Sequence, residues 1–282
     1  MPIPFDLLFQ TLGSNPALHT PGTPVYQLLK TVARAQIEPL FSNPEPTPQP
    51  FGPFGNLILP YTKMGAIDSL DLFGLDEMII FAFYHANRGR YRRVIDIGAN
   101  IGLHSIVMSR CDYEVRCFEP DPWHFSLLNR NLTANNTRSV SAFPAAISTT
   151  DGEAQFVRVL GNTTGSHLAG AKDSYGEKEH FTVKTTAIAS LLPGTDLAKI
   201  DAEGHEKVLL LTFTREVMQT LDVMVEVGSP ANAAAIFHHF TAMGVNLFAQ
   251  KIGWQPARTA ADLPTSHREG SLFLSVKPAM PW

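Results

Sequence analysis

Along most of this chain, short runs of apolar residues alternate with longer segments in which apolar residues recur every three or four positions. The short runs indicate buried strands, whereas the longer periodic segments indicate amphipathic helices. Strands are predicted at residues 94–97, 115–118, 139–143, 154–160, 181–188, 197–201, 221–227, 244–249 and 271–276. Helices are predicted at residues 103–108, 205–213 and 231–243, and a further helix begins at residue 122. This alternation predicts a Rossmann-like, doubly wound α/β sheet with mostly parallel strands.

Two details of the sheet depend on its connections. The apolar segment Ala145-Ala146-Ile147 comes directly after the strand at 139–143 and is expected to be a short continuation of it. Only a loop separates the last two predicted strands, so they are expected to form an antiparallel hairpin at the edge of the sheet.

The first 50 residues follow a different pattern. Prolines punctuate this segment and alternate with other residues from Asn43 to Pro50, which favours an extended conformation without a core of its own. One short helix is predicted from Val25 to Leu40, where apolar residues share one side. We expect residues 1–50 to form a proline-rich arm that packs on the main domain or on a second subunit of a homo-oligomer.

Residues 51–90 are expected to lead into the main domain at residues 91–282. Gly52, Gly55 and Pro60 surround the apolar segment 57–59, which favours a hairpin. Residues 72–87 are rich in Phe and Ile and predict a buried helix.

Composition limits the class of protein. Hydrophobic residues make up 44% of the 282 residues, which is ample for a core. The net charge of −4 and the scattered Lys and Arg predict no nucleic-acid partner. No apolar run is long enough to span a bilayer, and the N-terminus lacks the pattern of a signal peptide, so a cytoplasmic location is expected. Cys111 and Cys117 are therefore expected to be reduced thiols of the core.

The segment from Arg93 to Asp121 carries the most specific pattern. The strand at 94–97 runs into the turn Gly98-Ala99-Asn100-Ile101-Gly102, and a helix and a second strand ending on Glu119 follow. Strand, glycine turn, helix, strand and acidic tip are together the signature of a βαβ nucleotide-binding unit. Glycine lets the backbone approach a ligand, and the carboxylate at the tip can accept hydrogen bonds from both hydroxyls of a ribose. The ligand is therefore expected to contain a ribose.

The identity of this ligand depends on what the turn lacks. The spacing is G-x-x-x-G rather than the G-x-G-x-x-G of dinucleotide folds, and no P-loop lysine follows. Asp96 precedes the turn, and a carboxylate there repels phosphate but suits a ligand with an ammonium or sulfonium charge. These features predict S-adenosylmethionine rather than NAD or ATP. The alternative is an ordinary strand-to-helix turn.

Four acidic residues, Asp96, Glu119, Asp201 and Glu226, lie at or near the carboxyl ends of predicted strands. Open α/β sheets bind their ligands outside these ends. A buried carboxylate is costly unless it has a partner, so four of them at one edge indicate a functional site.

The segment from Lys199 to Glu206 is the densest of these candidates. Glu203 and His205 fall in the turn after the strand, and either is a candidate base for a hydroxyl acceptor, with Asp201 orienting the base or the substrate. The alternative is that both residues open the next helix as capping or surface residues. Asp201, Glu203 and Glu226 also offer oxygen ligands that suit Mg²⁺, but no His or Cys spacing supports a metal site, and no metal is predicted.

The blocks DIGANIGLHS, FEPDP, KIDAEGHE and VEV resemble those of the FkbM-type S-adenosylmethionine-dependent methyltransferases, from near Leu75 to the C-terminus. The resemblance implies a seven-stranded sheet and methylation of a hydroxyl on a small acceptor of the sugar, glycolipid or polyketide type. It also implies that residues 51–90 cover the cofactor site, which brings in Lys63, Ser69 and Glu77, although surface or capping roles are favoured for each. The rival functions are N-methylation of a small molecule and cofactor binding without catalysis in an interaction protein.

The predicted site residues fall into three groups. Those expected to bind S-adenosylmethionine are Asp96, Gly98, Ala99, Asn100, Gly102, Glu119, Pro120, Ala146, Ile147 and Asp201. Those expected to be catalytic are Asp201, Glu203 and His205, and those expected to border the acceptor pocket are Asn162, Ser166 and His167. A packing or solvent-facing role is expected for His104, and no role is assigned to His180, His238, His239 and His267.

Overall fold

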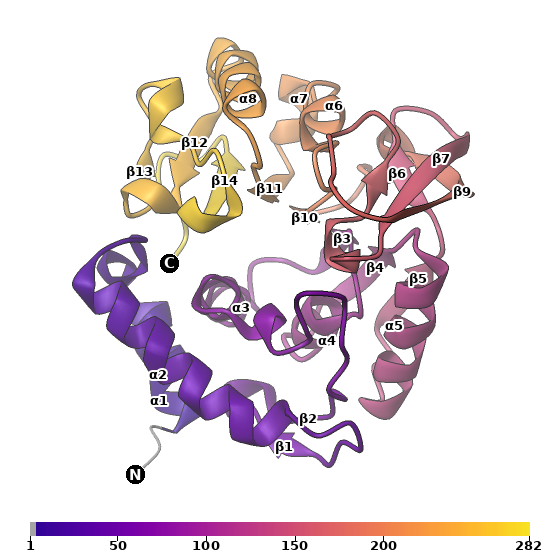
Figure 1. The fold of residues 1–282 in the computed structure, drawn as a ribbon. Coiled ribbons are helices and arrows are strands. Elements are labelled where there is room, and N and C mark those ends of the chain that lie inside the picture. The colour runs from indigo at the N-terminus through magenta and orange to yellow at the C-terminus, as the bar shows by residue number, and fades with distance from the viewer. Residues whose placement is uncertain (1–3) are drawn as a thin grey trace.

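A computed structural model describes residues 4–282, which fold around a mixed eight-stranded sheet (Figure 1). In spatial order the strands are β13 (Gln255–Pro256), β12 (Asn246–Ala249), β14 (Ser271–Ser275), β11 (Asp222–Glu226), β10 (Leu197–Ile200), β3 (Arg93–Ile97), β4 (Glu114–Phe118) and β5 (Val140–Phe143). Strands β11, β10, β3, β4 and β5 are parallel neighbours, whereas β14 is antiparallel to β11 and β12. The predicted α/β class is confirmed, and the large sheet is mixed, with five consecutive parallel strands.

The sheet has one strand more than the seven implied by the resemblance. Strand β13 has only two residues and pairs with β12 at the edge of the sheet. The antiparallel pairing of β12 with β14 is confirmed, but β13 rather than this hairpin forms the edge. A two-residue strand has too few positions for the alternation of apolar and polar residues that reveals a strand in a sequence.

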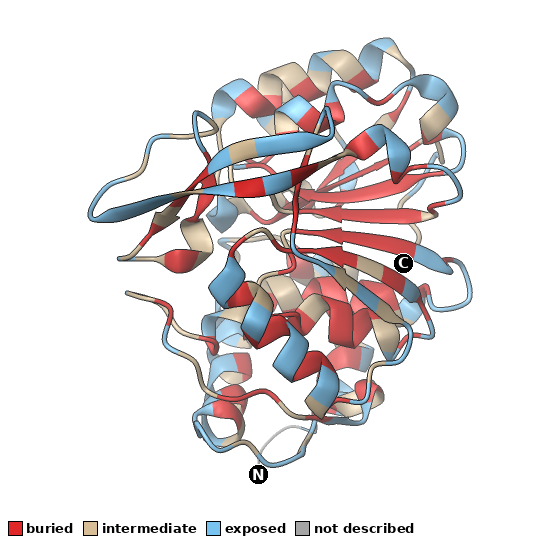
Figure 2. Cartoon of the chain, turned by 90° about the vertical axis from the view of Figure 1, so that its right-hand side faces the viewer, coloured by how far each residue is buried: buried red, intermediate tan, exposed pale blue. Residues whose placement is uncertain are grey.

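Helices cover both faces of the sheet (Figure 1). The helices on one face are α3 (Leu75–Ala86), α4 (Leu103–Ser109) and α5 (Pro122–Ala134), and those on the other are α6 (Glu206–Leu210), α7 (Arg215–Met218) and α8 (Pro230–Ala242). Successive side chains of a strand point to opposite faces, so Val94 of β3 packs with the first group and Ile95 with the second. Figure 2 shows the central strands buried along their length.

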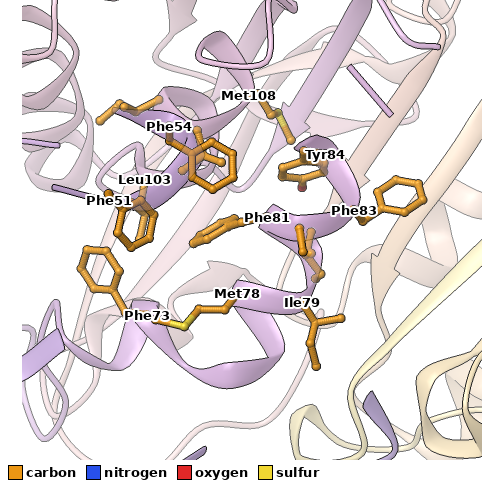
Figure 3. Close-up of a cluster of buried hydrophobic side chains, with 14 of the residues drawn as sticks. Phe51, Phe54, Phe73, Met78, Ile79, Phe81, Phe83, Tyr84, Leu103 and Met108 are labelled. Carbon is orange, nitrogen blue, oxygen red and sulfur yellow. The ribbon is translucent and has the colours of Figure 1, made fainter. Parts of the chain in front are cut away.

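Helix α3 lies at the centre of the first core. Eight of its residues are buried, from Leu75 to Tyr84, and a helix that is apolar on all sides must be enclosed by other elements. Figure 3 shows Phe81 of this helix among Phe51, Phe54 and Phe73. Because α3 is held so firmly, the polar residues in its first turn have fixed positions.

The N-terminal segment is more ordered than the predicted arm. It forms two helices, α1 (Phe5–Ser14) and α2 (Pro24–Phe41), where one was expected, and α2 matches the predicted helix. Phe5, Leu8, Phe9 and Leu12 of α1 are buried in the same core as α3. Their helical spacing outweighs the helix-breaking effect of the flanking prolines. The described part of this segment therefore packs on the main domain of its own chain, and the expectation that it lacks a core is wrong.

The predicted hairpin and lead-in helix are present. Strands β1 (Gln49–Pro50) and β2 (Asn56–Leu57) pair antiparallel, and α3 follows. No helix among residues 4–282 combines the length and apolar character required to cross a membrane. Cys111 and Cys117 are buried and unpaired by any disulfide, as expected.

A second sheet of four strands lies beside the carboxyl edge of the main sheet. Its strands, in spatial order, are β6 (Ala146–Ser148), β9 (Lys178–Ala187), β7 (Gly152–Val159) and β8 (His167–Leu168). The expectation that residues 145–147 continue the strand before them is wrong, because β6 pairs with β9 and not with the main sheet. Pro144 stands between β5 and β6, and proline has no N–H to continue a ladder.

Arg158 attaches the second sheet to the rest of the domain. Its guanidinium donates to both carboxylate oxygens of Asp121, at 2.7 and 2.6 Å, and Asp121 caps the N-terminus of α5. The Asp121 side chain is only 1% exposed. A bidentate pair of this kind fixes orientation as well as distance, so it holds the second sheet over the tips of the main strands.

Candidate active site

A cavity of about 1040 Å³ lies at the carboxyl ends of β3, β4, β10 and β11, where open α/β sheets bind ligands. Its volume is at the upper end of the range for ligand pockets. Residues of α2 and α3 form one wall, residues 162–168 and Lys172 of the second sheet and its loops form another, and the turn at 201–206 forms a third. The lead-in segment therefore borders the site, as the resemblance implies.

The glycine turn has the unusual backbone that its sequence predicts. Gly98, Asn100 and Gly102 have positive φ angles of 78°, 52° and 90°. A Cβ at Gly98 would lie 1.8 Å from the carbonyl oxygen of Asp201, and one at Gly102 would lie 3.2 Å from Leu128. Both glycines therefore permit close contacts within the protein. Gly98 and Asn100 line the cavity, whereas Ala99 and Gly102 do not.

Glu119 follows β4 and lines the cavity. One of its carboxylate oxygens accepts a hydrogen bond from the N–H of Asn100 and the other from the N–H of Asp121, both at 2.8 Å. Burial raises the pKa of Glu119 to about 8, although these backbone hydrogen bonds oppose the shift. Each carboxylate oxygen keeps a further lone pair. The carboxylate is therefore held in place while it can still accept hydrogen bonds from a diol.

Asp96 lies below the cavity and does not line it. One of its oxygens accepts a hydrogen bond of 2.6 Å from the Ser105 hydroxyl, and the other lies 3.8 Å from Lys199 Nζ. Lys199 Nζ also lies 3.5 Å from Asp201 Oδ2. Burial disfavours the charged form, but the carboxylates of Asp201 and Asp96 raise the pKa of Lys199 above its ordinary value. Asp96 thus balances a buried ammonium group of the protein.

Glu206 orders the turn after β10, a role that sequence reasoning did not assign. Its carboxylate accepts hydrogen bonds from the N–H of Ala202 at 2.9 Å and of Gly204 at 3.0 Å. Between them, Glu203 has a φ of 49°, a left-handed conformation that is uncommon outside glycine. Backbone strain of this kind clusters at functional sites. In the sequence, this role could have been inferred from the position of Glu206, an acidic residue in the first turn of a predicted helix.

Asp201, Glu203 and His205 all line the cavity, so the structure brings the three predicted catalytic residues together. Glu203 forms an ion pair with Lys172, a residue from the loop after β8 that carried no signal in the sequence. Burial and the Asp201 carboxylate raise the pKa of Glu203 to about 7, against the effect of Lys172. Burial lowers the pKa of His205, whose Nε2 lies 3.4 Å from the Ser148 hydroxyl. The turn therefore presents a carboxyl that titrates near neutral pH.

Of the three lead-in residues considered, only Glu77 lines the cavity. Ser69 has a structural role, since its hydroxyl accepts a hydrogen bond from the Thr62 N–H. Glu77 accepts a hydrogen bond of 2.8 Å from His104 Nε2 and its side chain is 31% exposed. The packing role expected for His104 is confirmed by its contact with the Phe81 ring, with the ring centroids 4.8 Å apart.

The other predicted wall residues are in place. Those that line the cavity are Pro120, Ala146, Ile147, Asn162, Ser166 and His167. Two histidines without an assigned role also line it, His124 and His267, and His124 Nε2 lies 3.0 Å from the Thr163 hydroxyl. Neither has a partner close in sequence, so no spacing could have indicated them.

The charge of the cavity wall favours a cationic ligand. Carboxyl-bearing residues outnumber Lys and Arg in it, and they are Asp71, Asp76, Glu77, Glu119, Asp201, Glu203, Glu206 and Glu226, against Lys30, Arg34 and Lys172. Burial raises the pKa of Glu119 and Glu226, and Lys172 pairs with Glu203, so the excess of negative charge is smaller than this count. The carboxylates that stay ionised disfavour a diphosphate and suit a sulfonium or ammonium group. Across the described residues, no three or more His, Cys, Asp and Glu side chains are grouped in a way that could hold a metal ion.

Comparison with known proteins agrees with this chemistry. The model of the methyltransferase FkbM domain matches residues 96–243. The hexuronic acid methyltransferase AglP of Haloferax volcanii is 29% identical over 140 residues, which cover 47% of this chain and 54% of AglP. The chain thus spans about half the length of this curated relative.

Similar solved structures include the METTL16 methyltransferase domain, with 12% identity, coverage of 72% of this chain and 68% of the other, and a TM-score of 0.43. They also include the precorrin-6y C5,15-methyltransferase of Geobacter metallireducens, with 12% identity, coverage of 58% and 70%, and a TM-score of 0.35.

Proposed function

This chain belongs to the FkbM methyltransferase domain family, with S-adenosylmethionine as its cofactor, and we propose that it methylates a hydroxyl oxygen of a small, sugar-type acceptor. The observation that carries this proposal is Glu203, a cavity-lining carboxyl with a pKa of about 7. Hydroxyl methylation needs a base, and a base is most effective when its pKa lies near the working pH.

The cofactor fits the cavity by the chemistry of its walls. Glu119 would accept hydrogen bonds from the ribose hydroxyls, and Ala146 and Ile147 would flank the adenine. When bound, the cofactor supplies an electrophilic methyl group on a cationic sulfur. The ionised carboxylates of the wall would favour that charge, and Ile97 and Phe118 add apolar surface to the cavity.

Glu203 is the proposed base. Its carboxylate would take the proton of the acceptor hydroxyl as that oxygen receives the methyl group, which the bound cofactor would supply from its sulfur. Lys172 and the Glu206-capped turn hold this carboxylate in place, so less of the barrier arises from orienting it. His205 lies in the same turn and lines the cavity, where it would contact the acceptor, and Asp201 forms an ion pair with Lys199.

Two observations support the acceptor class: the activity that a relative is named for, and a lysine that lines the cavity. AglP is by its name a hexuronic acid methyltransferase. Lys30 of α2 lines the cavity of this chain, and an ammonium group there suits the carboxylate of a sugar acid. We therefore propose a sugar acid as the first acceptor to test.

The test uses methyl-labelled S-adenosylmethionine with uronic acids, neutral sugars and matched amino sugars. The wild-type protein is expected to label a hydroxyl acceptor, with kcat rising as pH increases through about 7, where Glu203 loses its proton. Glu203→Gln should lower kcat by about 10²- to 10⁴-fold and remove the pH dependence.

Glu216→Gln is the matched control, because Glu216 is an exposed carboxyl on α7. A Glu203→Gln enzyme with the kcat of wild type would contradict the proposed base. Label that enters only amine acceptors would indicate N-methylation, and label in no acceptor would indicate a protein that binds without catalysis.

A further inference from the structure

Glu77 extends into the cavity from the first turn of α3, yet the reaction proposed above leaves it without a role. We propose that Glu77 binds the α-ammonium group at the methionine end of the cofactor, and that His104 and Tyr84 position its carboxylate. This inference rests on the proposed function, because it requires S-adenosylmethionine in the cavity.

The geometry of Glu77 leaves one oxygen free for a ligand. Its Oε2 accepts the hydrogen bond from His104 Nε2, whereas Oε1 has no hydrogen-bond partner within residues 4–282. The Glu77 side chain is 31% exposed and borders the cavity. A carboxylate oxygen without a protein partner in an acidic cavity is a binding site for a cationic group.

His104 and Tyr84 hold this carboxylate from behind. The Tyr84 hydroxyl lies 3.1 Å from His104 Nδ1, and Tyr84 is fully buried. If the hydroxyl donates to Nδ1, the imidazole proton is placed on Nε2, where it donates to Glu77. The Phe81 ring packs on His104. This contact fixes the orientation of the imidazole, and with it the hydrogen bonds that link Tyr84, His104 and Glu77. A fixed carboxylate binds a ligand without the entropy loss of ordering a flexible side chain.

The order of the strands places Glu77 at the correct end of the cavity. Neighbouring strands run β5, β4, β3, β10 and β11. With adenine beside β6 and ribose at Glu119 after β4, the amino-acid tail must extend past Gly98 toward β10. Glu77 lies there, because a small side cavity is lined by Glu77, Asp201 and Glu226, together with Lys199.

Neighbouring charges lower the pKa of Glu77, in contrast to that of Glu226 at the same end of the cavity. Burial alone would raise its pKa, but His104 and Lys199 lower the pKa of Glu77 below the ordinary value. Burial and the Asp201 charge raise the pKa of Glu226 well above its ordinary value, which favours its neutral form. Asp201 is close to Lys199, and Asp96 is buried below the cavity. The lowered pKa of Glu77 favours its charged form, and its Oε1 has no hydrogen-bond partner within the described residues.

The test compares two ligands that differ in the amino-acid tail. S-adenosylhomocysteine carries the ammonium group, and 5′-methylthioadenosine lacks the amino-acid portion but keeps the adenine and ribose. Titration calorimetry with Glu77→Gln should show about 10- to 100-fold weaker binding of S-adenosylhomocysteine and less than about 2-fold change for 5′-methylthioadenosine. Glu216→Gln should change neither affinity.

A second variant tests the inference independently if Glu77→Gln does not fold. His104→Gln removes the link to Tyr84 but leaves Glu77 intact, and it should weaken S-adenosylhomocysteine selectively by a smaller factor. A purely structural role of Glu77 would lower both affinities together, and that result, or no change in either, would overturn the inference. Wild-type protein that does not bind S-adenosylhomocysteine would instead refute the proposed function.

Discussion

Gly98→Ala tests the finding that the glycine turn serves contact between β3 and β10. A Cβ at Gly98 would lie 1.8 Å from the Asp201 carbonyl oxygen, whereas ordinary contact begins at 3.4 Å. The obstacle is backbone in the neighbouring strand end, so no side-chain rotation can relieve it. Either the glycine turn or the Asp201 turn must move by more than 1 Å.

Two contributions determine how much free energy of unfolding Gly98→Ala is expected to lose. An L-residue in the left-handed region costs about 1–2 kcal/mol, and the φ of Gly98 is 78°. Overpacking adds about 1–3 kcal/mol. Gly22 has nearly the same φ, 82°, but nothing within 4 Å of its Cβ position. Gly22→Ala should therefore show the first contribution alone, and the difference between the two variants isolates the second.

Urea unfolding measures the free energy of unfolding of each variant. Gly98→Ala is expected to lose about 1–3 kcal/mol more than Gly22→Ala. Calorimetry should also show weaker binding of S-adenosylhomocysteine, because the displaced turn carries Asp201 and Glu203. Equal losses of stability in the two variants, with cofactor affinity unchanged in both, would refute the close-contact explanation.

Two further predictions concern the buried acidic groups. Arg158→Met leaves the carboxylate of Asp121 buried without its partner and should lower the free energy of unfolding by about 3–5 kcal/mol, and Asp121→Asn in the same chain should restore part of it. A loss below about 1 kcal/mol in urea unfolding would show that the second sheet does not depend on this pair. Glu119→Ala should weaken S-adenosylhomocysteine by about 1–3 kcal/mol in calorimetry. Because the pKa of Glu119 is raised to about 8 and a diol prefers the ionised carboxylate, wild-type affinity should rise as pH increases through about 8, and this rise should be absent in the variant.

The sequence by itself determined the elements of the main sheet and the order in which they occur. The strands at β3, β4, β10 and β11 lie within one or two residues of their predicted bounds, as does α8. These features depend on local periodicity, since a buried strand and an amphipathic helix distribute apolar residues differently along the chain. The turn at 98–102 and the acidic strand ends also follow from local chemistry, so the site could be located at one edge of the sheet.

Only the tertiary structure decided which side chains reach the cavity. Asp96 and Glu77 are both acidic residues beside buried segments, but strand register places Asp96 against Lys199 and the packing of α3 places Glu77 in the wall. Strand pairing likewise assigned β6 to the second sheet, and the approach of Asp201 explained Gly98. Each of these outcomes depends on groups distant in sequence that meet only when the chain is folded. The orientation of a side chain and the pKa of its acid are set by those neighbours, and a local pattern cannot contain them.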